Sequence, residues 1–593
     1  MKSSPTPHSS SSPYDSPRTL WAITIAFLLI WLYMLGARTL VPTDEGRYAE
    51  MAREMLATGD WITLRLNGIK YFEKPPLQNW MNALSFAAFG LGDWQARLWT
   101  GLCGLAGVAM VAYTGTKVFS RRVGISAALV LGSSFYWAGM GHVNSLDMGL
   151  SGMMTLSLCG LLLAQREHAS TREQRHGMLL CWLGMALATM SKGLIGFVLP
   201  GAVLVLYTLW TRDIALWTRL HLVKGLLLFF AVTAPWFILI ALKNPEHPHF
   251  FFIHEHFDRF TSNVHKRGGA WYYFFPFLIL GIVPWLGFLL QGLWAGVGKD
   301  KGLFQARKLL LVWSVFFFFF FSISGSKLPG YILPIFPALA LLIAVFLERA
   351  SARSMQIAAI LFGMIGLVGL LFINKAAGMG TTPYEIPLYQ GYAPWLAIAA
   401  GLTLAGGIAA WLLARKGLAG KDWACIILAA TGFVAGQIAF LGHDPWGKYI
   451  AGTAHIPAIQ AELKQPTTPI YAVGRYEQAL PFYLQHTLTL VEFPDEMQFG
   501  LEQQPELWIP KREDFIARWN RHISKGESAV AIVRTDIYAE FKAQQLAMRV
   551  IGEDPRRVII ATPPPVNSAH ASSQTIPTAS VPPTPAAGPS PSH

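Results

Sequence analysis

The stretch Leu309–Phe321 reads LLLVWSVFFFFFF and contains no charged residue. A helix needs about 20 predominantly apolar residues to cross the hydrocarbon core of a bilayer. Comparable apolar blocks recur along the chain, for example Leu20–Leu35 and Ile357–Ile373. Of the 593 residues, 53% are hydrophobic and 14% are charged, whereas a soluble domain has about 25% charged residues. The chain is therefore predicted to be a polytopic α-helical membrane protein.

The apolar blocks predict about thirteen transmembrane helices, and some are short enough to need tilt or burial against neighbours. They begin near residues 19, 97, 123, 147, 178, 193, 222, 272, 309, 330, 357, 393 and 423. The first block is too long for a signal peptide and lacks a small-residue cleavage site, so we expect it to be retained. The four cysteines, at 103, 159, 181 and 425, lie within apolar segments. They are predicted to be core residues, without disulfides or a cysteine-based metal site.

Short basic loops predict the orientation of these helices. Under this count one side of the membrane holds Arg121, Arg122, Arg166, Arg172, Arg175, Arg212, Arg219, Lys299, Lys301, Arg307, Lys308, Arg349, Arg353, Arg415, Lys416 and Lys421. By the positive-inside rule that side is cytoplasmic. The tail 1–18 joins it, and an odd number of spans leaves the C-terminus outside. The net charge of +13 is thus explained by basic residues in the cytoplasmic loops, and nucleic acid is not an expected partner.

The outward segments divide the chain further. The transmembrane domain is expected over 19–442, with a first outward loop at 39–96 and a second at 243–271. In the first loop Thr43 is a candidate helix cap, and the apolar spacing from Asp44 to Gly59 predicts an amphipathic helix that could lie on the membrane surface.

Residues 443–560 are predicted to form a small α/β domain outside the membrane. Short β-rich runs at Ile470–Val473, Thr487–Phe493 and Ala529–Val533 alternate there with helical stretches at Tyr476–Leu484 and Ile537–Leu546. Residues 561–593 are rich in Pro, Ser, Ala and Thr, which predicts a disordered tail.

Two acids are expected at the outward ends of separate segments, Asp44 in the first loop and Asp147 at the start of a span. Two acids at one depth can flank a sugar, and one can orient or deprotonate an acceptor. The plainer alternatives are that Asp44 complements a helix dipole and that Asp147 caps its span. However, an acid at a membrane boundary is costly unless it has a partner or a cavity.

Cations surround these acids on the same predicted face. Lys74 lies in the stiff sequence Glu73-Lys-Pro-Pro76 and can bind a phosphate as a point charge, although snorkelling to lipid headgroups is the alternative. Arg259 carries a planar guanidinium that suits phosphate. Lys192 and the segment Lys327–Tyr331 also face outward. Several cations beside carboxylates suit a lipid phosphate as leaving group.

A divalent metal is a further possibility. His254-Glu255-His256 would place both imidazoles on one face of an extended segment, where they can bind Zn²⁺ with Glu73 as a third ligand. A histidine-rich loop without metal is the alternative. No nucleotide cofactor is expected.

The same motifs resemble those of the GT-C superfamily of polyprenyl-phosphate-dependent glycosyltransferases, and are most similar to the bacterial lipid A aminoarabinose transferases. The likeness covers roughly residues 19–350. It rests on the strings Asp44-Glu-Gly-Arg-Tyr-Ala-Glu-Met-Ala-Arg-Glu-Met-Leu56, Gly59-Asp-Trp-Ile62, Tyr71-Phe-Glu-Lys-Pro75, His256-Phe-Asp-Arg-Phe260 and Lys327-Leu-Pro-Gly-Tyr-Ile-Leu-Pro334.

This resemblance implies a large helical membrane domain with a periplasmic C-terminal α/β domain, in a multi-pass protein of the bacterial inner membrane with a cytoplasmic N-terminus. The implied donor is a sugar on undecaprenyl phosphate, the acceptor is lipid A phosphate, and transfer inverts the anomeric centre. Asp44 and Asp147 take the places of the catalytic acids. The donor phosphate and lipid would be held by Arg47, Tyr71, Lys74, Lys192, Arg259, Lys327 and Tyr331.

The sequence departs from the family pattern in two places. After Pro75 it reads Pro76-Leu-Gln-Asn-Trp80, where enterobacterial members read Ile-Ala-Gly-Tyr-Trp, and Gly46 stands where they usually have Thr. Broader relatives with two prolines act on other sugars or on protein hydroxyls, so transfer of another sugar to protein or another glycan is the alternative function. A secondary transporter is disfavoured, because no internal repeat and few mid-span acids are evident.

Overall fold

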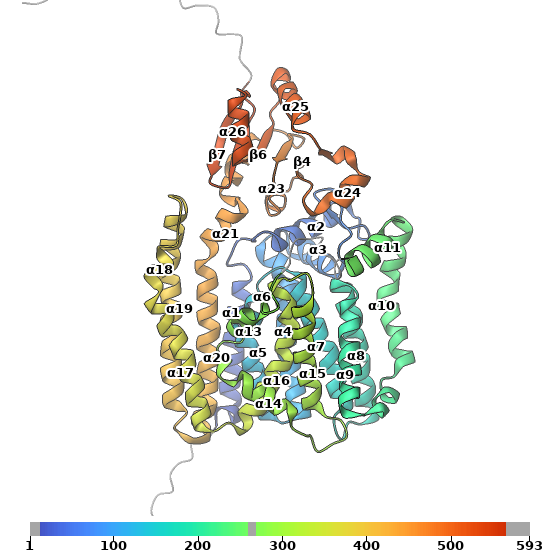
Figure 1. The fold of residues 1–593 in the computed structure, drawn as a ribbon, viewed down its shortest axis with the longest axis vertical. Helices are drawn as coiled ribbons and strands as arrows, with labels where there is room; N and C mark the ends of the chain where they lie inside the picture. Colours follow the sequence, from blue (N-terminus) through green and yellow to red (C-terminus); the bar gives the residue numbers. More distant parts are fainter. Residues whose placement is uncertain (1–11, 259–268, 565–593) are drawn as a thin grey trace, which may run out of the picture.

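The computed structural model describes residues 12–258 and 269–564. A bundle of helices carries a small α/β domain at one end, called here the upper end (Figure 1). Within the described residues, nine helices are long and apolar enough to cross a membrane, or ten if one bent pair counts as a single span. The predicted fold class, a polytopic helical membrane protein with a C-terminal α/β domain, is confirmed.

A helix lies at each of the thirteen predicted spans. The spans are α1 (Pro17–Met34), α4 (Asp93–Val118), α5 (Arg121–Ser133), α7 (Leu146–Gln165), α8 (Thr171–Lys192), α9 (Ile195–Thr211), α10 (Leu222–Lys243), α13 (Phe274–Gly281) with α14 (Leu289–Val297), α15 (Ala306–Ile323), α16 (Phe336–Arg349), α17 (Ala352–Leu371), α19 (Glu385–Leu413) and α20 (Gly417–Gly442). The pair α13 and α14 bends by 104° at its break. Helices α5 and α9 are short and α8 is less apolar, so they are not among the nine or ten helices that are long and apolar enough to cross a membrane.

Helix α7 forms the centre of the bundle and is buried along almost its whole length. It packs closely against α8 through glycines. A Cβ at Gly184 would lie 2.5 Å from the backbone nitrogen of Ser157, so the two backbones meet without side chains between them, as is common between membrane helices. In contrast, α1 exposes Trp21 and Leu29 on its outer face. The four cysteines are buried and unbonded, as predicted.

The first loop forms α2 (Asp44–Thr58), a short hairpin of β1 (Arg65–Leu66) and β2 (Ile69–Lys70), and α3 (Leu77–Phe89). Helix α2 ends at Gly59 with φ +69°, as predicted, but the Thr43 side chain makes no capping hydrogen bond. The expectation that α2 lies on the membrane surface is wrong, because the α/β domain covers it. A Cβ at Gly46 would lie 2.5 Å from Cα of Ala479.

The α/β domain contains a six-stranded sheet with the order β5-β4-β3-β6-β8-β7, in which β5, β4, β3 and β6 are parallel and β8 and β7 are antiparallel additions. Its elements are β3 (Ile470–Val473), α23 (Leu480–Leu484), β4 (Thr489–Val491), β5 (Trp508–Ile509), α25 (Arg512–Lys525), β6 (Val530–Arg534), α26 (Thr535–Ala543), β7 (Arg549–Asp554) and β8 (Arg557–Ala561). The predicted strands correspond to β3, β4 and β6. The sequence did not indicate β5, β7, β8 or α25.

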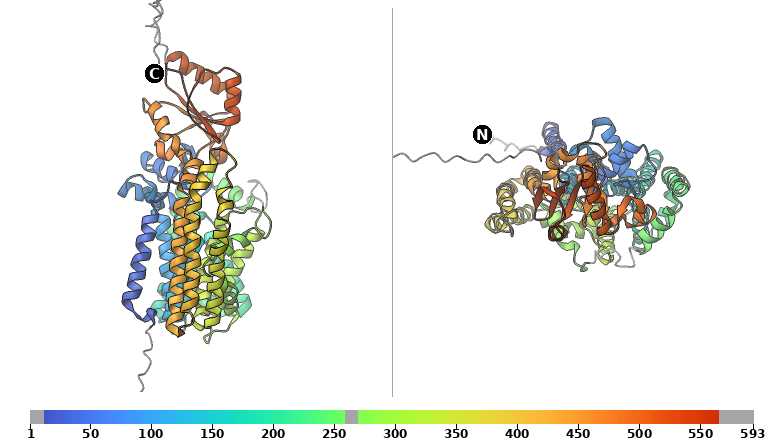
Figure 2. Two further views of the ribbon diagram at one scale, coloured as in Figure 1. Left: turned by 90° about the vertical axis from the view of Figure 1, so that its left-hand side faces the viewer. Right: turned by 90° about the horizontal axis from the view of Figure 1, so that it is seen from above.

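Both boundaries of the folded chain differ from the sequence estimate. At the lower end Tyr14, assigned to the tail, is buried and lies 3.3 Å from the Ser126 hydroxyl of α5. At the other boundary β8 runs to Ala561, and Thr562 is hydrogen bonded to Ala529. The predicted disordered segment from 565 onwards lies outside the described residues. Figure 2 shows the α/β domain rising above the ends of the long helices.

Helix α2 also carries a buried pair of acids, Glu50 and Glu54, beneath the α/β domain. Glu50 pairs with Arg53 at 2.6 Å, and one oxygen of Glu54 accepts from the amide of Gly68 at 2.8 Å. Burial, assisted by the Glu50 charge, raises the pKa of Glu54 from 4.5 to about 8. The folded protein therefore keeps a proton that the unfolded chain releases above its lower pKa. This contribution is fully present below about pH 4.5 and is lost as the pH rises to about 8.

Glu54→Gln, which is neutral at every pH, should remove this pH dependence. We expect the variant to melt several degrees above the unaltered protein at pH 8 and close to it at pH 5. Thermal unfolding in one detergent across this range checks the expectation. Glu513→Gln, at an exposed position of α25, is the control. Melting temperatures of Glu54→Gln and the unaltered protein that change in parallel with pH would contradict the raised pKa of Glu54.

Candidate active site

An ion pair between two neighbouring helices forms the centre of the site. Asp147 lies in the first turn of α7 and Lys192 is the last residue of α8, so the two ends meet at the upper end of the bundle. The Lys192 ammonium pairs with the Asp147 carboxylate and lies 4.6 Å from the ring centre of Tyr331. Each charge thereby offsets the cost of burying the other.

The segment η5 (Pro329–Ile335) closes over this pair. A Cβ at Gly330 would lie 2.3 Å from Oδ2 of Asp147. A larger residue there would displace the Asp147 carboxylate, which gives a physical reason for glycine in the Lys-Leu-Pro-Gly-Tyr sequence.

A cavity of about 130 Å³ opens beside the ion pair. Its polar wall consists of Glu73, Lys74, Asp147, Lys192, Glu255 and Tyr331, and its apolar wall of Leu150, Ile195, Phe320 and Phe321. The structure thus brings together five of the residues singled out from the sequence. Two ammonium groups above an apolar wall can bind an anionic head attached to a hydrocarbon chain.

Lys74 reaches this cavity from the loop between β2 and α3. Its ammonium donates to Glu255 at 2.7 Å and to the backbone oxygen of Glu73 at 2.9 Å. The Glu73 carboxylate lies 3.6 Å away. Lys74 is therefore held by carboxylates from two segments far apart in the chain and is only 13% exposed, which argues against snorkelling to the lipid headgroups.

Asp44 is the first residue of α2, and its side chain is 40% exposed. Burial of the carboxylate raises its pKa. The Arg47 guanidinium at 3.8 Å opposes this rise, and the Asp147 charge adds to it. The charge of Asp147 thus acts on Asp44, and their joint action on one sugar stays a prediction. Asp44 also lines a second, open cavity of about 470 Å³.

Arg47 and Tyr71 join the first loop to the α/β domain. The Arg47 guanidinium donates to Gln478 at 2.8 Å and to the Tyr71 hydroxyl at 3.2 Å, and it pairs with Glu496 at 2.6 Å. These partners occupy the guanidinium that the family resemblance assigned to the donor phosphate. Arg47 therefore links the first loop to the α/β domain, and binding of a phosphate would replace its ion pair with Glu496.

Lys327 does not line the cavity. Its ammonium donates to the backbone oxygen of Ser324 at 2.6 Å, just after the end of α15, and the residue is 7% exposed. The charge therefore complements the C-terminal end of a helix. Arg259 lies outside the described residues, so its predicted role is untested.

The predicted metal ligands have a different local structure from the one assumed. Residues Phe250–Asp258 form a π-helix, η3, and in a helical segment residues two apart face nearly opposite directions. The His254 ring lies 5.1 Å from that of Phe250, Glu255 faces Lys74, and the side chain of His256 is not described. Among the described residues no group of three or more His, Cys, Asp or Glu could hold a metal. An extended His-x-His pair is therefore wrong, and Zn²⁺ at Glu73 and these histidines stays a prediction.

Sequence reasoning missed Glu255, Gln478 and Glu496. Glu255 was not singled out, because the histidines on either side of it suggested a metal site and not an ion pair with Lys74. Gln478 and Glu496 contact Arg47 from more than 400 positions along the chain, and no local pattern signals such a contact. Only the fold of the α/β domain over α2 reveals them.

Comparison with known proteins identifies relatives of both parts of the chain. Residues 16–295 match the family model described as dolichyl-phosphate-mannose-protein mannosyltransferase, and residues 455–562 match the aminoarabinose transferase C-terminal domain. The undecaprenyl phosphate-alpha-4-amino-4-deoxy-L-arabinose arabinosyl transferase of Aeromonas salmonicida is 33% identical over 60% of this chain. That alignment spans 66% of the relative, just under two thirds. A protein of the same name, numbered 2, from Proteus mirabilis is 30% identical over 68% of this chain and 72% of its own length.

A solved structure resembles nearly the whole chain. ArnT from Cupriavidus metallidurans bound to undecaprenyl phosphate is 39% identical, with a TM-score of 0.86, and covers 91% of this chain and 97% of that one. The similarity therefore includes the membrane domain and the α/β domain together, and the resemblance drawn from the first-loop motifs is confirmed. The chain belongs to the family of undecaprenyl phosphate-alpha-4-amino-4-deoxy-L-arabinose arabinosyl transferases.

Proposed function

We propose that this protein transfers 4-amino-4-deoxy-L-arabinose from undecaprenyl phosphate to a phosphate of lipid A at the periplasmic face of the bacterial inner membrane. The observation that carries the proposal is the cavity in which Lys74 and Lys192 lie above an apolar wall beside Asp147. A solved relative of 39% identity was determined with undecaprenyl phosphate. Transfer lowers the negative charge of the outer surface and favours resistance to cationic peptides such as polymyxin.

The reaction exchanges one phosphate for another on the sugar. An oxygen of the lipid A phosphate forms a bond to the anomeric carbon, while the bond from that carbon to the undecaprenyl phosphate oxygen breaks with inversion. The leaving phosphate gains negative charge, which Lys74 and Lys192 stabilise. A phosphate monoester is largely ionised at neutral pH and needs little help from a base, so Asp44 orients the acceptor or supports positive charge on the sugar.

The second cavity, which Asp44 lines, supports a lipid acceptor. Arg38, Thr43, Asp44, Tyr392 and His443 line its upper part, and Phe135 and Ala439 belong both to it and to an apolar groove among α17, α19 and α20. A lipid could therefore keep its chains in the groove while its phosphate approaches Asp44 beside Arg38. One cavity lined by Lys74 and Lys192 and a separate cavity lined by Asp44 suit a reaction between two lipids.

Narrowing the passage between this cavity and the groove tests the route of the acceptor. We expect Ala439→Trp to lower transfer to lipid A by about tenfold and to leave binding of the donor lipid unchanged. Ala430→Trp, at an exposed position of the same helix α20, should have little effect on either. Equal loss of donor binding and transfer in Ala439→Trp would contradict a separate acceptor route.

The overall function is tested by mass spectrometry of lipid A from cells with and without the protein. A mass increment of one aminopentose on phosphate is expected only in cells that contain it. The matching mannosyltransferase family model over residues 16–295 supports one alternative, transfer of a sugar to protein or to another glycan. Unchanged lipid A together with an altered glycoprotein would favour that alternative.

A further inference from the structure

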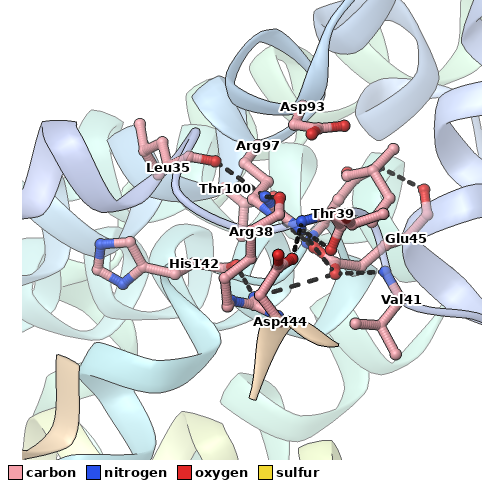
Figure 3. Close-up of polar contacts among 12 residues, drawn as sticks. Leu35, Arg38, Thr39, Val41, Glu45, Asp93, Arg97, Thr100, His142 and Asp444 are labelled. Carbon is pink, nitrogen blue, oxygen red and sulfur yellow. Dashed lines mark hydrogen bonds and ion pairs between the residues drawn. The ribbon is translucent and has the colours of Figure 1, made fainter. Parts of the chain in front are cut away.

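The residue that follows Asp44 is a buried carboxylate with several partners. Glu45 is 2% exposed and accepts four hydrogen bonds. Three come from Nε and Nη2 of Arg97 at 2.6 and 3.0 Å and from the amide of Val41 at 2.9 Å (Figure 3). The fourth comes from the amide of Asn144 at 3.0 Å. Burial alone would raise its pKa, but the charges of Arg97 and Arg38 outweigh burial and hold the pKa below its ordinary value. Glu45 is thus a fixed anion.

Arg97, in the first turns of α4, is fully buried and uses all five of its N–H donors. Besides its two bonds to Glu45, Nη1 donates to the backbone oxygens of Leu35 and Arg38 at 2.9 and 2.6 Å, and Nη2 donates to that of Thr39 at 3.0 Å. These oxygens belong to the segment that leads from α1 into α2. Figure 3 shows the guanidinium surrounded by that segment and by Glu45. One side chain therefore fixes the path by which the chain enters α2.

Glu45 also holds the segment that leads into α7. The backbone amide of Asn144 donates to the Glu45 carboxylate, and its side-chain Nδ2 donates to the backbone oxygen of Glu45 at 3.1 Å. Asn144 is itself held by Gln78 and Asn82 of α3 at 2.8 and 2.9 Å. Asn144 precedes Asp147 by three residues, and Glu45 follows Asp44 directly. The starts of both acid-bearing helices are thus joined at one residue.

We propose that Glu45 and Arg97 are positioning residues that fix the placement of Asp44 relative to Asp147. The inference rests on the proposed function, because it assumes that these two acids act on one sugar. A shift of about 1 Å in a catalytic group can lower a rate by about 100-fold. Glu45 accepts from four donors and Arg97 donates to five acceptors, so the start of α2 can move less than if a single hydrogen bond held it.

Glu45→Gln tests the inference, because it keeps the shape of the side chain but places an amide N–H₂ against donors. We expect kcat to fall by about 100-fold, the KM for the undecaprenyl-phosphate donor to change by less than about threefold, and the acid limb of the pH profile of kcat to shift. Arg97→Lys keeps the charge with fewer donors and should lose about tenfold in kcat, whereas Arg97→Met should lose more. These comparisons separate positioning from charge.

Glu50→Gln is the matched control, since Glu50 is an equally buried and ion-paired carboxylate on α2 that has no bond to the segment before α7. A similar loss of Tm in Glu45→Gln and Glu50→Gln, with kcat lowered only in the first, supports positioning. Loss of kcat in proportion to Tm in both variants overturns it. Should Glu45→Gln fail to fold, Arg97→Lys decides by the same comparison. An unaltered protein without aminoarabinose transfer would overturn the proposed function, and with it this inference.

Discussion

Asp44→Asn is expected to lower kcat for sugar transfer by about 100- to 1,000-fold, while the donor lipid still binds. Asparagine keeps the size of the side chain and removes only its negative charge. Asp44 lines the second cavity, and the charge of Asp147 in the first cavity acts on its carboxylate, so the Asp44 charge can stabilise positive charge that develops on the sugar. Removing one such electrostatic contact from an active site commonly costs about 100- to 1,000-fold in rate.

Two measurements check this expectation. Transfer is followed by mass spectrometry of lipid A, and binding of undecaprenyl phosphate by native mass spectrometry of the purified protein. Asp60→Asn is the control, because Asp60 lies in the same first loop but pairs with Lys243 at 2.9 Å, away from both cavities. Equal loss of transfer and of donor binding in Asp44→Asn would assign Asp44 to binding and contradict the proposed role.

The pH dependence of transfer gives a second view of the same residue. Burial raises the pKa of Asp44 above 3.8. If its charged form is required, transfer should fall on acidification at a higher pH than for an ordinary aspartate. This acid limb should disappear from the residual activity of Asp44→Asn.

The membrane fold could be predicted from composition, because an apolar block of about 20 residues is stable when it is removed from water and crosses a bilayer as a helix. Sidedness then brought Asp147, Lys192 and Lys74 to one end of the bundle, where the structure places them. The sequence could not show that Asp147 and Lys192 are partners, since it fixes the depth of a residue but not the direction in which its side chain points. Lys327 illustrates the limit, because it has the expected depth yet turns to the end of α15.

Long-range contacts explain most of the other differences. The pattern of α2 shows an apolar face, but it does not tell whether lipid or another domain covers the helix. The resemblance assigned Arg47 to the donor phosphate, and its observed partners Gln478 and Glu496 could not be foreseen because they come from the α/β domain. Strand β5 was missed because it is very short. Strands β7 and β8 form a hairpin around Pro555-Arg556, and the turn signal Asp554-Pro555 between them was overlooked.

Lys192→Met should cause the second large effect, because it leaves the buried carboxylate of Asp147 without its cation. Asp147 is 7% exposed and the Lys192 side chain 12%, so solvent screens the pair only weakly. Removing one member of a buried pair commonly costs about 3–5 kcal/mol of folding stability. We expect a clear loss of Tm together with loss of transfer. Arg219→Met, which opens a pair with Asp213 whose arginine is 34% exposed, should cost much less.

The double variant Lys192→Met with Asp147→Asn separates stability from chemistry. It removes both charges, so no buried carboxylate is left unpaired, and Tm should return towards that of the unaltered protein. Transfer should stay absent, because the cavity has lost the cation that stabilises the leaving phosphate and the acid beside it. Recovery of transfer in the double variant would show instead that the pair only holds α7 and α8 together. If the pair acts in catalysis, the double variant regains Tm but not transfer. If the pair is only structural, it regains both, so the single and double variants together decide between these two roles.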